Sequence, residues 1–243
     1  MENVIEVRGL TKSFNGKEVL KGIDLSVKRG ENVVVLGRSG EGKSVTIQCI
    51  AALLTPDSGT VKVLGQDIHS LGEEALKDLR KKMGFLFQQA ALYDSMSVRE
   101  NLSFPLKAVL KIKDPAEIKM RSEEVLEAVG LQDAIDKMPS ELSGGQRKRM
   151  GLARTLVVNP EIILYDEPTT GLDTITSQEI SHLIMDVQKR YKATAIIITH
   201  DMHCAKVTAD RILIMNDGKY IAEDSYEALE NSPDKLINSF FKF

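Results

Sequence analysis

A glycine-rich loop between an apolar strand and a helix restricts what this chain can fold into. The stretch Gly37 to Ser44 reads Gly-Arg-Ser-Gly-Glu-Gly-Lys-Ser and matches Gly-x-x-x-x-Gly-Lys-Ser/Thr at every fixed position. Before it, Asn32 to Leu36 is predicted to be a buried strand, and after it Val45 to Leu54 is predicted to be a helix. A chance glycine loop would not need these flanks. The pattern therefore predicts a site for the phosphates of a nucleoside triphosphate.

The residue types of the loop indicate how it would hold phosphate. Glycines let backbone N–H groups approach a phosphate closely, and the helix N-terminus adds partial positive charge. Lys43 is expected to reach the β- and γ-phosphates, and the Ser44 hydroxyl is expected to ligate Mg²⁺. The predicted ATP contacts are Gly37, Arg38, Ser39, Gly40, Glu41, Gly42, Lys43, Ser44 and Val45.

Length, charge and cysteine content exclude several classes of protein. The chain has 243 residues, enough for one large domain, and its net charge of −3 gives no general attraction to nucleic acid, so no nucleic-acid partner is expected. The basic cluster Arg147-Lys148-Arg149 is interpreted as a solvated helix face. Cys49 and Cys204 fit no metal or disulfide pattern, which favours a reducing cytoplasmic setting. No apolar run approaches the ~20 residues that span a bilayer, so any membrane-spanning part is expected in another chain.

Strand and helix patterns alternate along the chain and predict an α/β fold with a mostly parallel sheet. Residues 1–89 and 159–243 are expected to form a phosphate-loop core with an N-terminal antiparallel β subdomain, and residues 90–158 an inserted helical subdomain within a single domain. The predicted strands include Val4 to Val7, Val19 to Val27, Met83 to Phe87, Glu161 to Tyr165, Ala193 to Thr199 and Arg211 to Met215. The predicted helices include Val98 to Leu102, Pro115 to Val129, Gln146 to Val158 and Thr176 to Tyr191.

Two adjacent carboxylates end an apolar strand in the second half of the chain. Asp166 and Glu167 follow Ile162 to Tyr165, and the carboxyl end of a parallel strand opens into the crevice where ligands bind. Asp166 can hold Mg²⁺ directly or through water, and Glu167 can polarise a water aimed at the γ-phosphate. A solvated turn is the alternative, and the phosphate loop in the same chain favours the functional interpretation.

The pentapeptide Leu142 to Gln146 reads Leu-Ser-Gly-Gly-Gln and opens a further predicted helix, so it offers a second anion-binding helix N-terminus. One nucleotide already has its phosphates at the first loop, and a second anion site in the same chain needs an explanation. Gly-Gly alone would fit a flexible hinge. The whole pentapeptide, 20 residues before Asp166, favours a binding element.

In this order the motifs resemble those of the ABC transporter ATPase family. The resemblance rests on Gly37 to Ser44, Leu142 to Gln146, Asp166-Glu167, Gly171-Leu172-Asp173 and His200, and it covers essentially the whole chain. It implies an ATPase that uses ATP and Mg²⁺ as a head-to-tail homodimer. Each ATP would lie between one chain's phosphate loop and the partner's Ser143, Gly144, Gly145 and Gln146.

The resemblance also implies roles for four further residues. Phe14 would stack on adenine, and Gln88 would sense Mg²⁺ and the γ-phosphate at the contact with a membrane permease. Asp173 would lie at the dimer seam, and His200 would contact the γ-phosphate. The permease contact is expected on the apolar run after Gln88, which comprises Ala90, Ala91, Leu92, Tyr93 and Met96; packing inside the helical subdomain is the alternative.

Several segments resemble one branch of the family, the Mla-type phospholipid transport ATPases. They are Leu86 to Val98, Asn101 to Leu106, Glu127 to Leu131, Met138 to Leu142 and Asp173 to Thr176, although Thr174 stands where that branch usually has Pro. The branch implies a polytopic permease, an MCE-type lipid-binding protein and a peripheral place on the cytoplasmic face of the inner membrane. The alternatives are the ATPase of an amino-acid importer or of a lipoprotein-release system.

Two other classes of function compete with transport. A soluble ABC ATPase acting on nucleic acid or ribosomes is expected to have two cassettes, a coiled-coil insertion or a basic surface, whereas this chain has one cassette and a net charge of −3. A nucleotide-regulated adaptor without turnover would often lack a general base, whereas Glu167 is present. Both comparisons favour the transport ATPase.

Overall fold

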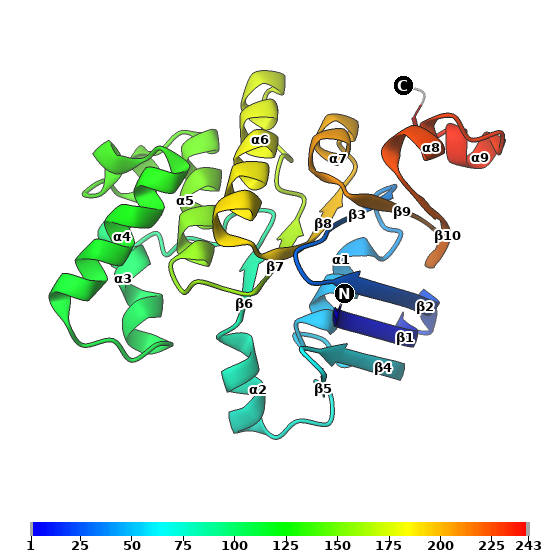
Figure 1. The fold of residues 1–243 in the computed structure, drawn as a ribbon, viewed down its shortest axis with the longest axis horizontal. Coiled ribbons are helices and arrows are strands. Elements are labelled where there is room, and N and C mark those ends of the chain that lie inside the picture. The colour runs from blue at the N-terminus through cyan, green and yellow to red at the C-terminus, as the bar shows by residue number, and fades with distance from the viewer. Residues whose placement is uncertain (1, 242–243) are drawn as a thin grey trace.

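A six-stranded sheet forms the centre of the fold (Figure 1). The computed structural model describes residues 2–241. The strand order is β10-β9-β3-β8-β7-β6, and every neighbouring pair except β10 with β9 is parallel. The strands are β3 (Asn32–Gly37), β6 (Met83–Leu86), β7 (Ile162–Asp166), β8 (Thr194–Thr199), β9 (Arg211–Asn216) and β10 (Lys219–Asp224). The predicted α/β fold with a mostly parallel sheet is confirmed.

A second, four-stranded sheet is antiparallel, as predicted, and has the order β2-β1-β4-β5. Its strands are β1 (Asn3–Phe14), β2 (Lys17–Lys28), β4 (Ser58–Val63) and β5 (Gln66–Asp67). The prediction that the first strand ends at Val7 is wrong, because β1 continues to Phe14. Irregular pairing between Val7 and Leu10, with Gly9 at φ 55°, interrupts the alternation of apolar residues that a sequence pattern relies on.

The described chain contains nine α-helices and two short 3₁₀ helices, and α8 and α9 follow the last strand. The helices are α1 (Lys43–Ile50), α2 (Glu73–Arg80), α3 (Val98–Ala108), α4 (Pro115–Val129), η1 (Gln132–Ala134), η2 (Pro139–Glu141), α5 (Gly144–Leu156), α6 (Thr174–Tyr191), α7 (Met202–Thr208), α8 (Tyr226–Glu230) and α9 (Lys235–Asn238). No helix in the described range 2–241 has both the length and the apolar character to cross a bilayer.

Several helix boundaries differ from the prediction: α5 begins and ends two residues earlier than predicted, α6 begins two residues earlier, and α1 and α3 end elsewhere. Helix α1 ends at Ile50 rather than Leu54, because Ala52 adopts the left-handed conformation with φ 53°. Helix α3 continues past Leu102 to Ala108 and contains Pro105, which removes one N–H donor without ending the helix; the Val109 N–H donates to the Pro105 carbonyl (2.9 Å).

The two faces of the central sheet are packed into different cores. Along β3, Val34 and Leu36 belong to a core shared with α3 to α7, whereas Val33 and Val35 belong to a core shared with α1 and the four-stranded sheet. This alternation follows from side chains pointing to opposite faces of a strand. Burial on both faces explains why β3, β7 and β8 are almost continuously apolar.

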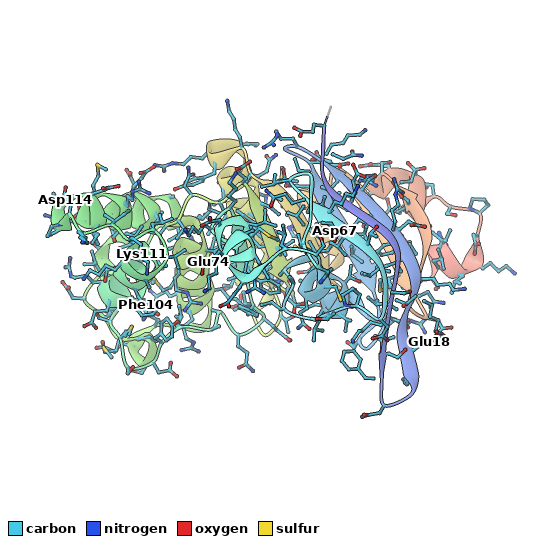
Figure 2. All side chains as sticks on the ribbon, turned by 90° about the horizontal axis from the view of Figure 1, so that it is seen from below. Glu18, Asp67, Glu74, Phe104, Lys111 and Asp114 are labelled. Carbon is cyan, nitrogen blue, oxygen red and sulfur yellow. The ribbon has the colours of Figure 1, made fainter. Side chains whose placement is uncertain are left out.

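The helices α3, α4 and α5 gather at one end of the molecule (Figure 1). In the view of Figure 2, Phe104, Lys111 and Asp114 lie at that end, and Glu18 lies in the other half of the molecule on the β1–β2 hairpin. The described residues 90–158 contain helices and no strand, in agreement with the helical character expected there. Their treatment as a separate subdomain stays a prediction.

Candidate active site

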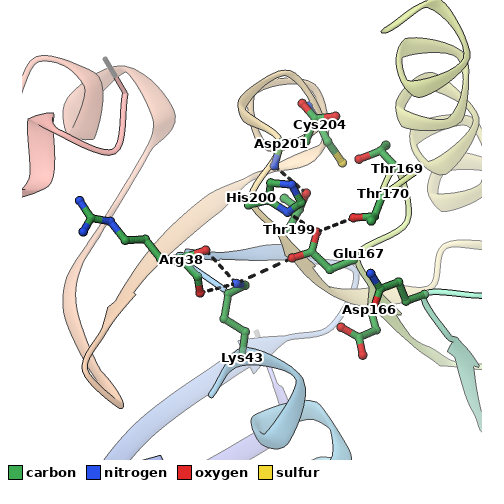
Figure 3. A network of polar contacts seen from close by, with 12 residues as sticks. Arg38, Lys43, Asp166, Glu167, Thr169, Thr170, Thr199, His200, Asp201 and Cys204 are labelled. Atoms are coloured by element: carbon green, nitrogen blue, oxygen red, sulfur yellow. Dashed lines mark hydrogen bonds and ion pairs between the residues drawn. The ribbon is translucent and has the colours of Figure 1, made fainter. Parts of the chain in front are cut away.

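Four parallel strands end at the same edge of the central sheet, and each is followed by a predicted site residue. The glycine loop follows β3, Gln88 follows β6, Glu167 follows β7 and His200 follows β8. Because the carboxyl ends of neighbouring parallel strands share one edge, residues far apart in sequence meet there. Figure 3 shows Lys43, Asp166, Glu167 and His200 converging on one space.

Glycine at position 42 is required by the geometry of the loop. Gly42 is the N-cap of α1 with φ 102°, and a Cβ there would lie 2.8 Å from Leu20 Cδ2 and 2.9 Å from the Val19 carbonyl. Helix α1 has neither a side-chain cap nor an acidic residue in its first turn, whereas Ser or Asp caps α3 to α6. The first N–H groups of α1 are therefore suited to an anionic ligand.

The Lys43 side chain is buried at the centre of the site. Its Nζ donates to the carbonyls of Gly37 (2.7 Å) and Arg38 (3.0 Å) and lies 3.7 Å from Glu167 Oε1. Burial lowers the pKa of Lys43, and the carboxylates of Glu167 and Asp166 oppose that shift. An ammonium held among carbonyls and carboxylates in a buried position is a strong partner for a phosphate.

Oxygen ligands suitable for Mg²⁺ lie beside the lysine. The Ser44 Oγ donates to Asp166 Oδ1 (2.7 Å), and Asp166 is only 8% exposed. Burial raises the pKa of Asp166, against the opposing hydrogen bond from Ser44. Gln88 lines a cavity of about 750 Å³ together with Asp166. A hydroxyl, a carboxylate and an amide are hard oxygen ligands, so these three residues fit Mg²⁺.

Glu167 is held from several sides. Its Oε2 lies 2.8 Å from His200 Nδ1 and accepts from Thr170 Oγ1 (3.1 Å). Because an ionised carboxylate can only accept, this pair needs the imidazole proton on Nδ1, which leaves Nε2 for another partner. The Glu167 backbone has φ 50°, and its N–H donates to the Ile198 carbonyl (2.9 Å). The prediction placed Glu167 and His200 at the γ-phosphate separately, and the structure brings the two together.

Other loop side chains point away from Lys43. The Arg38 side chain extends from the cluster (Figure 3), and its guanidinium carbon lies 5.8 Å from the centre of the Phe240 ring. The carboxylate of Glu41 accepts from the Asp217 N–H in the β9–β10 turn. These two residues therefore contact neighbouring segments with their side chains. Ser39 and Gly40 are exposed, and Val45 packs against the core on the α1 side of the sheet.

The Leu142 to Gln146 element forms the start of α5. Ser143 Oγ accepts from the Gln146 N–H (3.2 Å), and Gln146 Oε1 accepts from the Ser143 N–H (2.9 Å), which is a capping box. A Cβ on Gly145 would lie 2.5 Å from Thr176 Cγ2, so this position needs glycine. Asp173 caps α6 and accepts from the same Thr176, both from its N–H (3.0 Å) and its hydroxyl (2.6 Å).

Phe14 lies at the far end of β1, and 41% of its surface is exposed. The Lys12 Nζ lies 5.5 Å from the centre of its ring, on the hairpin that β1 forms with β2. The ring is therefore accessible for stacking, as the prediction requires.

Lys148 corrects the interpretation of the basic cluster. It is 6% exposed, and its Nζ donates to the Gln88 carbonyl and to the Glu167 carbonyl (3.2 Å). Burial lowers the pKa of its ammonium to about 8. Arg149, interpreted as solvated, donates to Val129 O (3.0 Å) and pairs with Glu179 (2.9 Å). Of the cluster, only Arg147 has the expected exposed position.

Comparison with known families shows which family the chain belongs to. The family described as "ABC transporter" matches residues 20–170, more than half of the chain. The chain belongs to the ABC transporter family. The predicted family is confirmed, and this ABC ATPase hydrolyses ATP as the ATP-binding subunit of a transporter.

Curated relatives carry different substrate names. The chain is 39% identical over 236 residues to the "Probable ribonucleotide transport ATP-binding protein mkl" of Mycobacterium leprae, covering 97% of this chain and 68% of the relative. It is 39% identical over 226 residues to the "Methionine import ATP-binding protein MetN" of Caulobacter vibrioides, covering 92% and 68%. The ABC ATPase described here thus spans about two thirds of the length of these relatives.

Two solved structures have the same fold and are about as similar to the chain as each other in sequence. The dimeric post-hydrolysis structure of the ATP-binding cassette MJ0796 bound to ADP and Pi has a TM-score of 0.82 and 32% identity, with 91% of this chain and 98% of that chain covered. The structure of cbiO1 from Clostridium perfringens, part of the ABC transporter complex cbiONQ, has a TM-score of 0.86 and 30% identity, with 100% and 96% covered.

Sequence reasoning missed two contacts in the site of this ABC ATPase. Thr170 donates to Glu167, and its spacing of three residues from a predicted base is the signal that would have found it. Lys148 has no such signal, because its partners are main-chain carbonyls from β6 and β7 loops that the sequence does not connect to α5.

Proposed function

We propose that the chain uses Lys43, Glu167 and His200 to hydrolyse MgATP and thereby powers a separate permease that moves phospholipid between membranes. The observation that carries the catalytic part is the convergence of these three side chains, with Lys43 3.7 Å and His200 2.8 Å from the two Glu167 oxygens. A bound γ-phosphate would draw Lys43 away from Glu167. Glu167 would then be free to accept a proton from the attacking water, with His200 Nε2 facing the phosphate.

The residues proposed to bind the metal lie at the same edge of the central sheet. Ser44 and Asp166, which are joined by a 2.7 Å hydrogen bond, would hold Mg²⁺ together with Gln88, which lines the same cavity as Asp166. Bound Mg²⁺ would neutralise charge that develops on the phosphates. Phe14 would stack on adenine from the β1–β2 hairpin, and the loop residues 37–45 would surround the phosphates.

The start of α5 supports a homodimer with composite sites. Ser143 and Gln146 form the capping box on Gly144 and Gly145, and Ser143 Oγ still carries its own proton for a phosphate oxygen. The partner chain's copy of this element would complete the site of the first chain. Asp173 would lie at the seam, where its Thr176 partner also packs on Gly145. The dimeric structure of MJ0796 supports this arrangement.

Mixing two inactive variants tests the composite site. Ser143→Arg and Lys43→Ala chains are each expected to lack hydrolysis, because the first blocks the partner's γ-phosphate site and the second lacks the ammonium that holds the phosphates. Mixed dimers keep one intact site, so equal mixing should restore roughly a quarter of the wild-type rate. If each ATP site were formed within a single chain, mixing the two variants would restore no hydrolysis. A mixture of Ser143→Arg with itself at the same total concentration is the control, and failure to recover turnover at any ratio contradicts the dimer.

An apolar groove beside Gln88 supports docking of a permease helix. Two adjoining hollows of about 230 and 180 Å³ share Arg80, Met83, Gly84 and Phe85 on the edge strand β6 and the end of α2. The exposed apolar residues around these hollows are Leu53, Phe87, Tyr93, Phe104 and Val109. Of the run predicted to face the permease, Ala90 is buried and Leu92 packs against the core, so for these two the core alternative holds.

Tyr93 is presented to the groove by a fixed loop. Fully buried Asn101 accepts from the Tyr93 N–H (2.9 Å) and donates to the carbonyls of Tyr93 (3.1 Å) and Met96 (2.9 Å). The Tyr93 ring packs edge-on against Phe104 at 5.1 Å and lies 5.4 Å from the Arg154 guanidinium. Because a buried asparagine fixes the loop, the ring can serve as an anchor for a partner.

Tyr93→Glu is expected to uncouple the complex and spare the isolated subunit. A carboxylate in the apolar contact should weaken permease binding by about tenfold or more, which corresponds to at least about 1.4 kcal/mol. Permease-stimulated ATP hydrolysis is the measurement, with basal hydrolysis of the isolated chain alongside. Met120→Glu places the same charge on another exposed apolar residue of the helical part, outside the groove, and should change neither rate. If the Tyr93→Glu chain assembles with the permease and its ATP hydrolysis is stimulated normally, the permease contact does not include Tyr93.

The phospholipid substrate is supported by segments 86–98, 101–106, 127–131, 138–142 and 173–176, which resemble the Mla-type branch. An MCE-type lipid-binding protein would be a further partner, and the ATPase would lie on the cytoplasmic face of the inner membrane. Amino-acid import is the second candidate, because MetN of Caulobacter vibrioides is a methionine import ATP-binding protein by name and is 39% identical. Transport in either case needs a permease, and the cbiONQ complex of which cbiO1 is a part provides the precedent.

Co-purification distinguishes the two substrates. The chain, co-expressed with the membrane proteins encoded beside it, is purified in detergent, and bound lipid is identified by mass spectrometry. Phospholipid held by the complex, together with stimulation of ATP hydrolysis by phospholipid and not by methionine, supports the first candidate. Stimulation by methionine alone supports amino-acid import and contradicts phospholipid transport.

A further inference from the structure

A buried lysine joins three elements of the ATPase without touching a carboxylate oxygen. Lys148 is in the second turn of α5, and its hydrogen-bond acceptors in the described chain are the carbonyls of Gln88 and Glu167. A buried ammonium is retained only where it is well hydrogen-bonded. Here both of its acceptors belong to the main chain of residues proposed to act on the metal and on water.

The carbonyls of Gln88 and Glu167 belong to residues whose side chains are proposed to act on the metal and on water, so a small shift of either main chain would misplace a catalytic group. Glu167 is fixed at its N–H by Ile198 and at its carboxylate by His200 and Thr170, and Lys148 fixes the carbonyl. Its φ of 50° is uncommon for a residue with a side chain, so this conformation needs support from its neighbours. The Lys148 contact supplies such support from α5.

The segment after β6 is attached to α5 by two cations. Lys148 donates to Gln88 O, and Arg154 Nη1 donates to Ala91 O (2.6 Å) two turns further along the helix. Arg154 also lies over Tyr93, which borders the groove. The segment 88–93 is therefore attached to α5 at two points, and through Lys148 it is linked to the Glu167 turn.

We propose that Lys148 is a positioning residue that sets Gln88 and Glu167 relative to each other and transmits displacements of α5 and the 88–93 segment to the catalytic turn. The proposal rests on the proposed roles of Glu167 as base and Gln88 as metal ligand. It assigns to Lys148 no contact with the nucleotide. Its two sequence neighbours point elsewhere: Arg147 donates to Leu142 O (2.6 Å), and Arg149 donates to Val129 O.

The test is Lys148→Met, which keeps the length of the side chain and removes its donors. Because misplacement of a catalytic group by about 1 Å can cost about 10²-fold, we expect kcat for MgATP to fall about 10-fold to 100-fold. KM for ATP should stay within roughly threefold, because the phosphate ligands are untouched. The melting temperature should fall as well, because the Gln88 and Glu167 carbonyls lose their donor, so kcat is compared with that of a variant that loses similar thermal stability.

Matched variants separate positioning from a general structural role. Arg149→Met removes a neighbouring α5 cation that also donates to a carbonyl, and it should lower the melting temperature while leaving kcat near the wild-type value. Lys148→Arg keeps charge and donors and should recover part of kcat. If Lys148→Met is too unstable to purify, Lys148→Gln, which keeps one amide donor group, is measured in the same way and should be intermediate.

Three outcomes are decisive. A reduced kcat with unchanged KM and partial recovery in Lys148→Arg supports the proposal. Native kcat in Lys148→Met or Lys148→Gln, or a loss of kcat that only follows the loss of thermal stability, overturns it. Glu167→Gln is assayed in parallel: if it is inactive while Lys148→Met is native-like, only the positioning role fails, and if Glu167→Gln is fully active, the assigned base fails and the positioning role fails with it.

Discussion

Glu167→Gln is expected to bind MgATP like the wild type and to hydrolyse it about 10²–10⁴-fold more slowly, the typical loss on removal of a general base. Glutamine has the size of glutamate, and its amide oxygen can keep the contacts with His200 and Thr170. It cannot take a proton from water. Lys43, Ser44 and Asp166 remain, so the phosphate and metal ligands are intact.

The variant should accumulate as an ATP-bound closed dimer. ATP stabilises the closed form by its differential affinity for it, and without hydrolysis nothing resets the equilibrium. Size-exclusion chromatography with MgATP measures the dimer, and single-turnover hydrolysis measures the chemical step. With the permease present, the same variant should lock the transporter.

Glu161→Gln is the matched control, because Glu161 directly precedes β7 and Glu167 directly follows it. Glu161 precedes β7 at the opposite end of the sheet, where it pairs with Arg29 (3.0 Å) and Lys82 (3.5 Å). Its amide variant should keep the wild-type rate. If Glu167→Gln hydrolyses ATP at near the native rate instead, the base is another residue, and His200 is the next candidate because its Nδ1 already lies 2.8 Å from this position.

The sequence predicts those parts of the site that depend only on which residues directly follow a strand. The loop at Gly37 to Ser44 and the pair Asp166-Glu167 each follow a buried strand, and parallel strands place their carboxyl ends together. These rules are enough to bring Lys43, Asp166 and Glu167 into one cleft without knowledge of distances. The pairing of His200 with Glu167 depends on the order of β8 beside β7, which the sequence alone did not provide.

Burial of charge was the least predictable property. Three consecutive basic residues on α5 look alike in sequence, yet the structure buries Lys148, half-buries Arg149 and exposes Arg147. The difference arises because α5 packs against the β6 and β7 loops, so the helix face with Lys148 meets carbonyls. Only the tertiary arrangement supplies that information.

The apolar groove was not predicted from the sequence, which indicated only a permease contact on the surface from Gln88 to Met96. Tyr93 belongs to that run and also lines the groove. Of the other residues around the groove, Phe104 lies on α3, Leu53 follows α1 and Phe87 follows β6. No short stretch of sequence contains all three. The same run was expected to face the permease, with core packing as the alternative, and for Ala90 the alternative holds; a Cβ on Gly151 of α5 would lie 2.8 Å from Ala90 Cβ.

Lys43→Ala is expected to abolish tight MgATP binding. Hydrogen bonds to charged groups contribute about 1.5–3 kcal/mol each, so loss of the ammonium should weaken ATP binding by roughly 10-fold to 100-fold or more. The structure adds a second cause. Asp166 and Glu167 would lose the buried cation 3.7 Å from Glu167 and would then repel the triphosphate.

Lys43→Met separates charge from packing in that result. Methionine fills most of the volume of the buried lysine stem, which is 6% exposed, but it carries no charge. If the ammonium is what holds phosphate, calorimetry should find both variants equally impaired for MgATP, with little loss of thermal stability in Lys43→Met. Binding by Lys43→Met at near wild-type affinity would assign the lysine a packing role, and affinity within a few-fold of wild type in Lys43→Ala would remove Lys43 from the phosphate site. Because Lys43 lies between the loop carbonyls of Gly37 and Arg38 and the carboxylate of Glu167, we expect its charge to link phosphate binding to the release of the base.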